Sequence, residues 1–268
     1  PSTAANHKRF AKIESSASIH TVTMLGNTTF TSAAYPEDFI MSLRLISPNG
    51  SASAATTLIL KSGLRCRDST DAYNIDLDAD VNGIITASGA GGLDTGTEAS
   101  SKWYPAHVLA DSSGANTPKL ILSLSSSAPT MPSGYDIWRR VGWVRNNSGG
   151  HFVRIQQLMD FVSREGITAA EALSAGSAAA FTDIDLSTFI PSTSYLAHIQ
   201  VRHPNGDMNF AFRRNGGQYG SASATSWFLE FKDGTGTQSH TGHLTIPTDT
   251  AQIIEYKKAS GSGGGAMV

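Results

Sequence analysis

Strand-length runs of β-forming residues, each closed by a turn signal, recur along the whole chain. Residues 39–46 and 57–61 are two such runs. The order Pro-Asn-Gly lies between them at residues 48–50 and returns at residues 204–206. Proline fixes φ and Asn-Gly tolerates positive φ, so both places favour a tight turn. Short strands separated by such turns predict an all-β sandwich or barrel.

The length of 268 residues suits two domains. Thr168 and Glu171 have capping-box spacing, which indicates a short helix or an ordered linker between the two domains. We therefore expect two antiparallel β-sandwich domains of jelly-roll type, joined by a short helical or irregular linker. The expected parts are an N-terminal arm at 1–17, a larger β-sandwich domain at 18–162, the linker at 163–179, a smaller β domain at 180–258 and a flexible Gly/Ser tail at 259–268.

Charge, cysteine content and hydrophobicity argue against several classes of protein, namely nucleic-acid-binding, disulfide-stabilised and membrane-spanning proteins. A net charge of -2 without a basic cluster predicts no nucleic-acid partner. Cys66 is the only cysteine, which rules out an intramolecular disulfide and predicts a small buried or half-buried residue. No run reaches the roughly 18–20 apolar residues of a membrane span. Residues 1–15 lack an apolar leader, so we expect synthesis in a cytoplasm.

Residues 73–82 alternate strictly between apolar and polar side chains. This period predicts one strand with a buried face and a solvated face. The polar face also matches the first half of a calcium loop, closed by Gly83. Gly89 stands where the bidentate glutamate belongs, and a strand cannot curl around an ion, so we expect no metal. The candidate ligands, if any, are Asp78, Asp80 and Asn82.

Aromatic residues crowd into residues 103–143. Strict alternation places Trp138, Arg140, Gly142 and Val144 on one strand face and Arg139, Val141, Trp143 and Arg145 on the other. Apolar residues on both faces predict a central strand or one covered at an interface. Aromatics in strands usually fill a core, but an exposed set can bind a sugar ring. The candidate ligand or interface aromatics are Trp103, Tyr104, Tyr135, Trp138 and Trp143.

Catalytic signatures are missing from the sequence. There is no Gly-x-Ser-x-Gly elbow and no phosphate-binding glycine loop followed by Lys-Ser/Thr. Glycoside hydrolysis needs two carboxylates across a cleft. The pairs on offer resemble ordinary strand faces or turns: Asp183 with Asp185, and Glu230 with Asp233. We expect no catalytic residue, no cofactor and no enzymatic activity.

A pattern of turns and aromatics across residues 70–258 resembles the β-sandwich modules of tailed-bacteriophage virion proteins. The segments that carry the resemblance in the first half are 92–96, 103–104, 122–125, 128–135 and 139–142. In the second half they run from 185–187 through 190–191. The resemblance brings no catalytic residues with it.

The resemblance implies a non-enzymatic virion structural protein at the particle surface: a tail fibre, a tail-associated protein or a head decoration. Its roles would be assembly and host-surface attachment. The implied partners are further copies of the chain, with a trimer favoured, other virion proteins and a host-surface glycan. The implied location is the virion, after synthesis in the host bacterial cytoplasm. The alternative function is a carbohydrate-binding module. A polysaccharide depolymerase ranks third, because the chain lacks the length and repeats of the long parallel β-helix that most of them carry.

Overall fold

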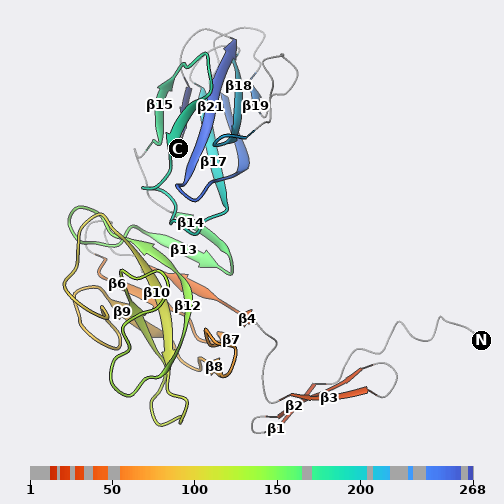
Figure 1. The fold of residues 1–268 in the computed structure, drawn as a ribbon, viewed down its shortest axis with the longest axis vertical. Helices are drawn as coiled ribbons and strands as arrows, with labels where there is room; N and C mark the ends of the chain where they lie inside the picture. The colour runs from red at the N-terminus through yellow and green to blue at the C-terminus, as the bar shows by residue number, and fades with distance from the viewer. Residues whose placement is uncertain are drawn as a thin grey trace, which may run out of the picture. The chain divides into compact units, whose positions relative to one another are not determined.

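The fold consists of strands joined by loops (Figure 1). The computed structural model describes residues 13–16, 19–24, 28–32, 39–47, 55–164, 171–203, 208–217, 229–231, 240–260 and 265–267. Within these ranges no helix is present, and every strand pair in the sheets is antiparallel. No described helix could therefore cross a membrane. The prediction of an all-β protein is confirmed.

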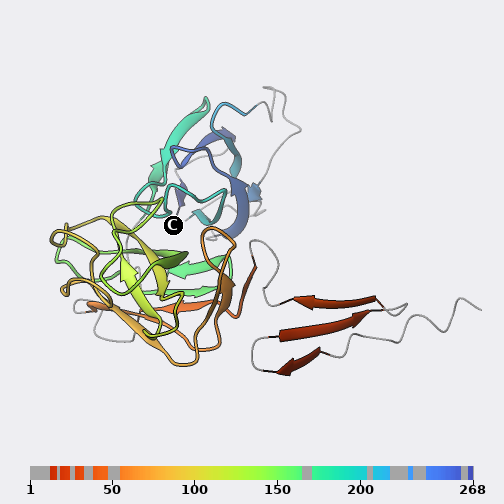
Figure 2. The same ribbon diagram turned by 60° about the horizontal axis from the view of Figure 1, so that its bottom comes forward.

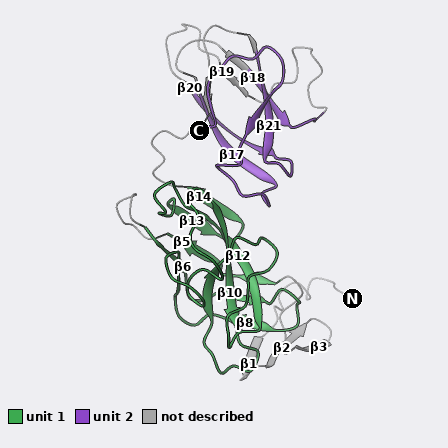
Figure 3. Ribbon diagram, turned by 60° about the vertical axis from the view of Figure 1, so that its left-hand side comes forward, with its two compact units in different colours: residues 1–166 green, residues 167–268 purple. Residues whose placement is uncertain are grey.

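The chain divides into two compact units, residues 1–166 and residues 167–268 (Figure 3). The first unit begins with a three-stranded sheet, drawn in red in Figure 2. Its strands are β1 (Ile13–Ser16), β2 (Ile19–Met24) and β3 (Thr28–Ser32). Strand β1 thus occupies part of the expected N-terminal arm, and residues 1–12 lie outside the described part of the chain.

Three further sheets complete the first unit. The five-stranded sheet has the order β14 (Phe161–Arg164), β13 (Ile155–Leu158), β5 (Arg44–Ile46), β6 (Thr57–Leu60) and β9 (Val81–Ile84). A three-stranded sheet has the order β11 (Lys119–Leu122), β10 (Trp103–Ala110) and β12 (Ile137–Arg145). The last has the order β4 (Ile40–Met41), β7 (Arg65–Arg67) and β8 (Asn74–Asp76).

These three sheets share one hydrophobic core. Leu45 and Leu58 come from the five-stranded sheet, Val108 and Leu122 from the sheet around β10, and Cys66 from β7. All five side chains are fully buried. Alternate residues of β10, namely Tyr104, Ala106, Val108 and Ala110, point to this core, which is the arrangement of packed β-sheet layers. The architecture of this unit is therefore like that of a β-sandwich.

The second unit contains two four-stranded sheets. One has the order β15 (Leu173–Gly176), β22 (Gly265–Met267), β17 (Leu196–His203) and β20 (His240–Pro247). The other has the order β16 (Thr182–Asp185), β21 (Ile253–Ser260), β18 (Met208–Arg214) and β19 (Leu229–Phe231). Ile199 and Val201 of β17 share a core with Phe210 and Phe212 of β18 and with Ile254 of β21.

The segment between the units differs from the expected linker where it is described. β14 runs to Arg164, and Leu173–Gly176 is strand β15 rather than part of a helix. The candidate cap Thr168 lies outside the described residues. Gly265–Met267, which falls in the expected flexible tail, forms β22 and pairs with β15 and β17. Backbone hydrogen bonds hold such a strand whether or not its side chains favour β structure.

The single strand predicted for residues 73–82 is wrong. β8 ends at Asp76 and β9 begins at Val81, with a turn between them. Hydrogen bonds to a neighbouring loop hold this turn: the Leu77 N–H donates to the Leu64 carbonyl, and the Ser62 N–H donates to Asp80 Oδ1 at 2.8 Å. The alternation still places Ile75 and Leu77 in the core, whereas Tyr73 is 47% exposed.

Candidate functional site

Strand β10 is the central strand of its sheet and the most completely buried strand of the first unit. Pro105 lies just beyond the paired end of β11, where Leu122 is opposite Ala106, and its carbonyl still accepts the Ser123 N–H at 3.1 Å. Tyr104 points into the core. Its hydroxyl donates to the Ala99 carbonyl at 2.9 Å and accepts from the Ala99 N–H at 2.7 Å. Tyr104 therefore has a structural role rather than a place on a ligand surface.

A β-bulge divides β12 and changes which of its side chains share a face. Ala106 of β10 lies opposite Gly142, but the next residue, His107, lies opposite Arg140. Val141 is the extra residue, and it points to the core with 3% exposure. The strict alternation expected for this strand is therefore wrong beyond Arg140, because a bulge adds one residue to one strand only.

Gln157 of β13 secures the bulge. Its Nε2 donates to the Val141 carbonyl at 3.0 Å and to the Met159 carbonyl at 2.8 Å. The Val141 carbonyl thereby keeps a partner although the regular ladder is interrupted there. A Cβ atom on Gly142 would collide with the Gln157 side-chain oxygen and lie 2.9 Å from Leu45 Cδ2. Only glycine fits this close approach between the two sheets.

Strand β12 is an edge strand, which excludes a central position and leaves cover at an interface, the other expected setting, as a prediction. Neighbouring loops occupy part of its free edge. The Ser69 N–H donates to the Trp138 carbonyl at 2.7 Å, and the Val153 N–H donates to the Arg145 carbonyl at 2.7 Å. Carbonyl groups with partners of their own cannot recruit a strand from another chain. These loops therefore protect part of the β12 edge from pairing with another strand.

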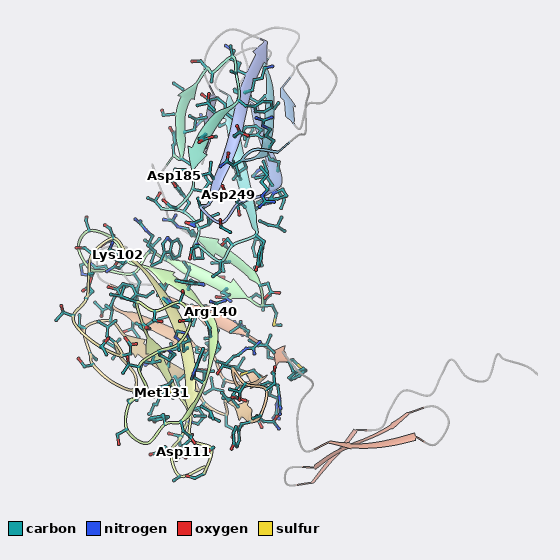
Figure 4. The ribbon with its side chains drawn as sticks, in the orientation of Figure 1. Lys102, Asp111, Met131, Arg140, Asp185 and Asp249 are labelled. Atoms are coloured by element: carbon teal, nitrogen blue, oxygen red, sulfur yellow. The ribbon has the colours of Figure 1, made fainter. Side chains whose placement is uncertain are left out.

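The bulge brings two tryptophans and two arginines together on the outer face of β12. We call Trp138, Arg140, Trp143 and Arg145 the Trp–Arg ladder. Their partners on β10 are Leu109, His107, Pro105 and Trp103, respectively. Three members of the ladder are half-buried and Arg140 is exposed. Figure 4 labels Arg140 on this strand.

Arg140 is held in place from two sides. Its guanidinium carbon lies 5.7 Å from the centre of the Trp143 ring, within cation–π distance. Its Nη1 donates to the Ser126 carbonyl at 3.0 Å, which connects the ladder to the loop after β11. The Trp143 Nε1–H and the Arg145 Nε–H are buried and have no hydrogen-bond acceptor in the structure. The ladder thus presents aromatic rings and cationic groups in alternation.

His107 lies beneath the ladder with no exposed surface. Neither of its ring nitrogens has a hydrogen-bond partner. Its ring lies edge-on to the Trp138 ring, with 5.1 Å between the two ring centres. Burial, and to a smaller extent the positive charge of Arg140, lowers the pKa of His107 to about 4, against the opposing effect of the negative charge of Asp94. His107 is therefore neutral near pH 7. Sequence patterns do not connect His107 with Arg140, since the bulge determines that pairing.

Asp94 and Ser123 lie close to His107, but the three do not form a catalytic triad. The Ser123 hydroxyl donates to Asp94 Oδ2 at 2.7 Å, and the same oxygen accepts the Thr130 N–H at 2.8 Å. The His107 ring nitrogens bond to neither residue. A serine nucleophile needs a base within hydrogen-bond reach, and that contact is missing. The carboxylate instead anchors the loop after β11.

The remaining candidate residues lie apart from the ladder. The Tyr135 hydroxyl donates to the Thr117 carbonyl at 3.1 Å, in the loops that flank β11. Asp80 forms an ion pair with Lys61, which lowers the pKa of its carboxyl group. Across the described part of the chain, no three His, Cys, Asp or Glu side chains are placed to hold a metal ion. Asp78 and Asn82 are exposed on either side of Asp80.

Of the five candidate aromatics, the sheet brings together Trp103, Trp138 and Trp143 on one face. It separates Tyr104, which is in the core, from Tyr135, which is in a loop.

Comparison of the chain with protein-family models and with curated proteins found no match. The site must therefore be interpreted from its own geometry.

Proposed function

We propose that this chain is a non-enzymatic structural protein of a bacteriophage particle surface, acting in assembly and in attachment to the host. The proposal is carried by the resemblance to phage virion modules, and two of the segments with that pattern, residues 103–104 and 139–142, lie in β10 and β12, the central strand and an edge strand of one sheet. A separately cored all-β second unit is consistent with a modular appendage.

The proposal extends to finer points of architecture. Each unit would be a β-sandwich of jelly-roll type, with two antiparallel layers around one core. The chain would assemble as a homo-oligomer, with a trimer favoured, and would dock to other virion proteins after synthesis in the host cytoplasm. Light scattering on purified protein tests the trimer: the expected mass is three times the 28.2 kDa of one chain. A monomer at micromolar concentration would contradict it.

Gold labelling of intact particles tests the virion role. Antibodies raised against the purified chain should label one defined part of the particle, either head, neck, tail or fibre. The same antibodies, absorbed beforehand with purified chain, provide the control. Particles that remain unlabelled, from cells in which the chain is detected, would count against a place on the particle surface.

A second candidate function is carbohydrate binding, either as the outward role of the same protein or in its own right. The Trp–Arg ladder favours it, because an aromatic face packs on the apolar face of a sugar ring while guanidinium groups donate hydrogen bonds to its substituents. A glycan array probed with the intact chain and with Trp143→Leu tests this function. Signals that persist unchanged in the variant would exclude the ladder as the binding surface.

A further inference from the structure

We propose that the Trp–Arg ladder binds a linear acidic oligosaccharide, with carboxylate groups paired to Arg140 and Arg145 and a sugar ring against Trp143. This inference rests on the carbohydrate-binding role and names the ligand class for that site. The ladder lies within the first unit, on β12 and beside β10, so the site needs no other part of the chain.

The register of the sheet sets the spacing of the ladder. Arg140 lies opposite His107, and Arg145 lies opposite Trp103. The two partners are four residues apart on β10, which corresponds to about 13 Å along a strand. Trp143 lies opposite Pro105, midway between the arginines. An occupant that meets both arginines must be an extended oligomer with repeated negative charges, since a monosaccharide cannot reach from one to the other.

The chemistry of the arginines favours carboxylates. A guanidinium group presents a planar fork of N–H donors that matches a carboxylate in two parallel hydrogen bonds. Arg140 is already oriented by Trp143 and by the Ser126 carbonyl, so less side-chain entropy is lost on binding. Its exposed position lets a ligand approach from solvent.

Arg145 adds a positive charge that the protein does not neutralise locally. Its Nη2 donates to the Ser101 carbonyl at 3.4 Å, and it forms no ion pair with any residue that the structure describes. The charge of Arg145, together with burial, lowers the pKa of the nearby Arg164 to about 10, with burial the larger cause. The guanidinium groups of Arg145 and Arg164 are close together and partly desolvated, so they attract an anion more strongly than the same groups in bulk water would.

Two classes of linear polyanion, single-stranded nucleic acid and acidic oligosaccharide, could contact the tryptophan rings and arginines of the Trp–Arg ladder. Single-stranded nucleic acid also combines aromatic stacking with arginine contacts. The chain as a whole has a net charge of -2, however, which disfavours a dense polyanion such as nucleic acid. An acidic oligosaccharide offers apolar ring faces for Trp143 and carboxylates for the arginines. We therefore favour the saccharide, and nucleic acid becomes an outcome of the test.

Calorimetry with the full chain tests the ligand class. The probes are tetragalacturonate, a tetramer of mannuronate and a hyaluronan tetrasaccharide, with galacturonate monomer and methyl-esterified tetragalacturonate as the neutral or short controls. We expect at least one acidic tetramer to bind, the controls not to bind, and affinity to fall as salt is raised. Binding of the esterified tetramer with equal affinity would overturn the acidic specificity while leaving carbohydrate binding intact. Equal or tighter binding of oligo-dT would overturn the saccharide assignment.

Single substitutions test the site. Arg140→Gln and Arg145→Gln should each weaken binding about 10-fold or more, the usual effect of losing a hydrogen bond to a charged group. Arg44→Gln is the matched control, since Arg44 is an exposed arginine on β5 of the same unit. Thermal unfolding of each variant confirms that it folds. The site is wrong if folded Arg140→Gln binds as the parent does, or if none of the acidic tetramers binds the parent. Neither result bears on whether the chain is found on particles.

Discussion

Replacing His107 with leucine should remove a specific part of the acid sensitivity of the first unit. His107 is completely buried, and both ring nitrogens lack a hydrogen-bond partner. Its neighbours on β10 and β11 across the same face are Leu109 and Ile121, which are also fully buried. A leucine side chain suits these surroundings, because it fills space without burying unsatisfied nitrogen atoms.

The sign of the effect follows from the two pKa values. The pKa of His107 is about 4 in the folded protein, against an ordinary value of 6.5. As the pH falls below 6.5, the unfolded chain takes up a proton that the folded chain refuses. Stability is therefore lost between pH 6.5 and about 4, and the loss levels off below that range. A difference of this size corresponds to about 3 kcal/mol.

Urea denaturation at several pH values between 7 and 4.5 measures this loss. Three of the four tryptophans, Trp103, Trp138 and Trp143, lie in the first unit, and Trp227 of the second unit is replaced by phenylalanine in parent and variant so that fluorescence reports on the first unit. His107→Leu should be more stable than the parent at pH 7, by about 1–3 kcal/mol, because the unsatisfied nitrogens are gone. It should also lose stability less steeply as the pH falls. His151→Leu, in the turn after β12, is the histidine control.

The account of His107 would be refuted if His107→Leu kept the full pH dependence of the parent. It would equally be refuted if NMR titration of the folded protein placed the pKa of His107 at or above 6.5. The carboxyl groups of Asp68, Asp111 and Asp249 titrate below the pH range of this measurement, because hydrogen bonds that they accept lower their pKa values. They affect stability at lower pH than the range in question.

Three further predictions concern the bulge, the cysteine and the second unit. Gly142→Ala should cost about 1–3 kcal/mol of stability through its collision with Gln157, and a urea midpoint equal to that of the parent would contradict this. Burial raises the pKa of Cys66 to about 12, so a thiol reagent should label it only on unfolding; rapid labelling of native protein at pH 8 would contradict this. Glu255→Gln should cost about 1–3 kcal/mol, since Glu255 accepts two hydrogen bonds from Arg213 at 2.6 and 3.1 Å; unchanged thermal unfolding of the second unit would show the pair to be unimportant.

The sequence predicted the fold class because period-2 patterns and turn residues report directly on local backbone structure. Ile75 and Leu77 are buried as the alternation requires, whereas Tyr73 and Ala79 of the same set are exposed and the predicted strand is interrupted. Buried Cys66 was predicted on similar grounds and is fully buried. These properties depend on the residue and its near neighbours. They need no knowledge of which strand lies beside which.

The site could not be predicted in the same way, because it depends on strand pairing. The one local signal of the bulge at Val141 is Gly142, a glycine inside a strand, and the change in register results from pairing with β10 and support from Gln157. One extra residue moves Trp143 to the face that holds Arg140, whereas strict alternation separates them. The turn that interrupts residues 73–82 likewise depends on contacts with a distant loop.

Quantitative mass spectrometry of purified phage particles tests the central claim most directly. The particles are those released from cells that carry the gene for this chain, purified by density gradient and washed at high salt. The virion role predicts that the chain stays with the particles in a fixed ratio to the major head protein, from one preparation to the next. Loss of the chain from the particle fraction, with recovery in the soluble fraction, would contradict the claim.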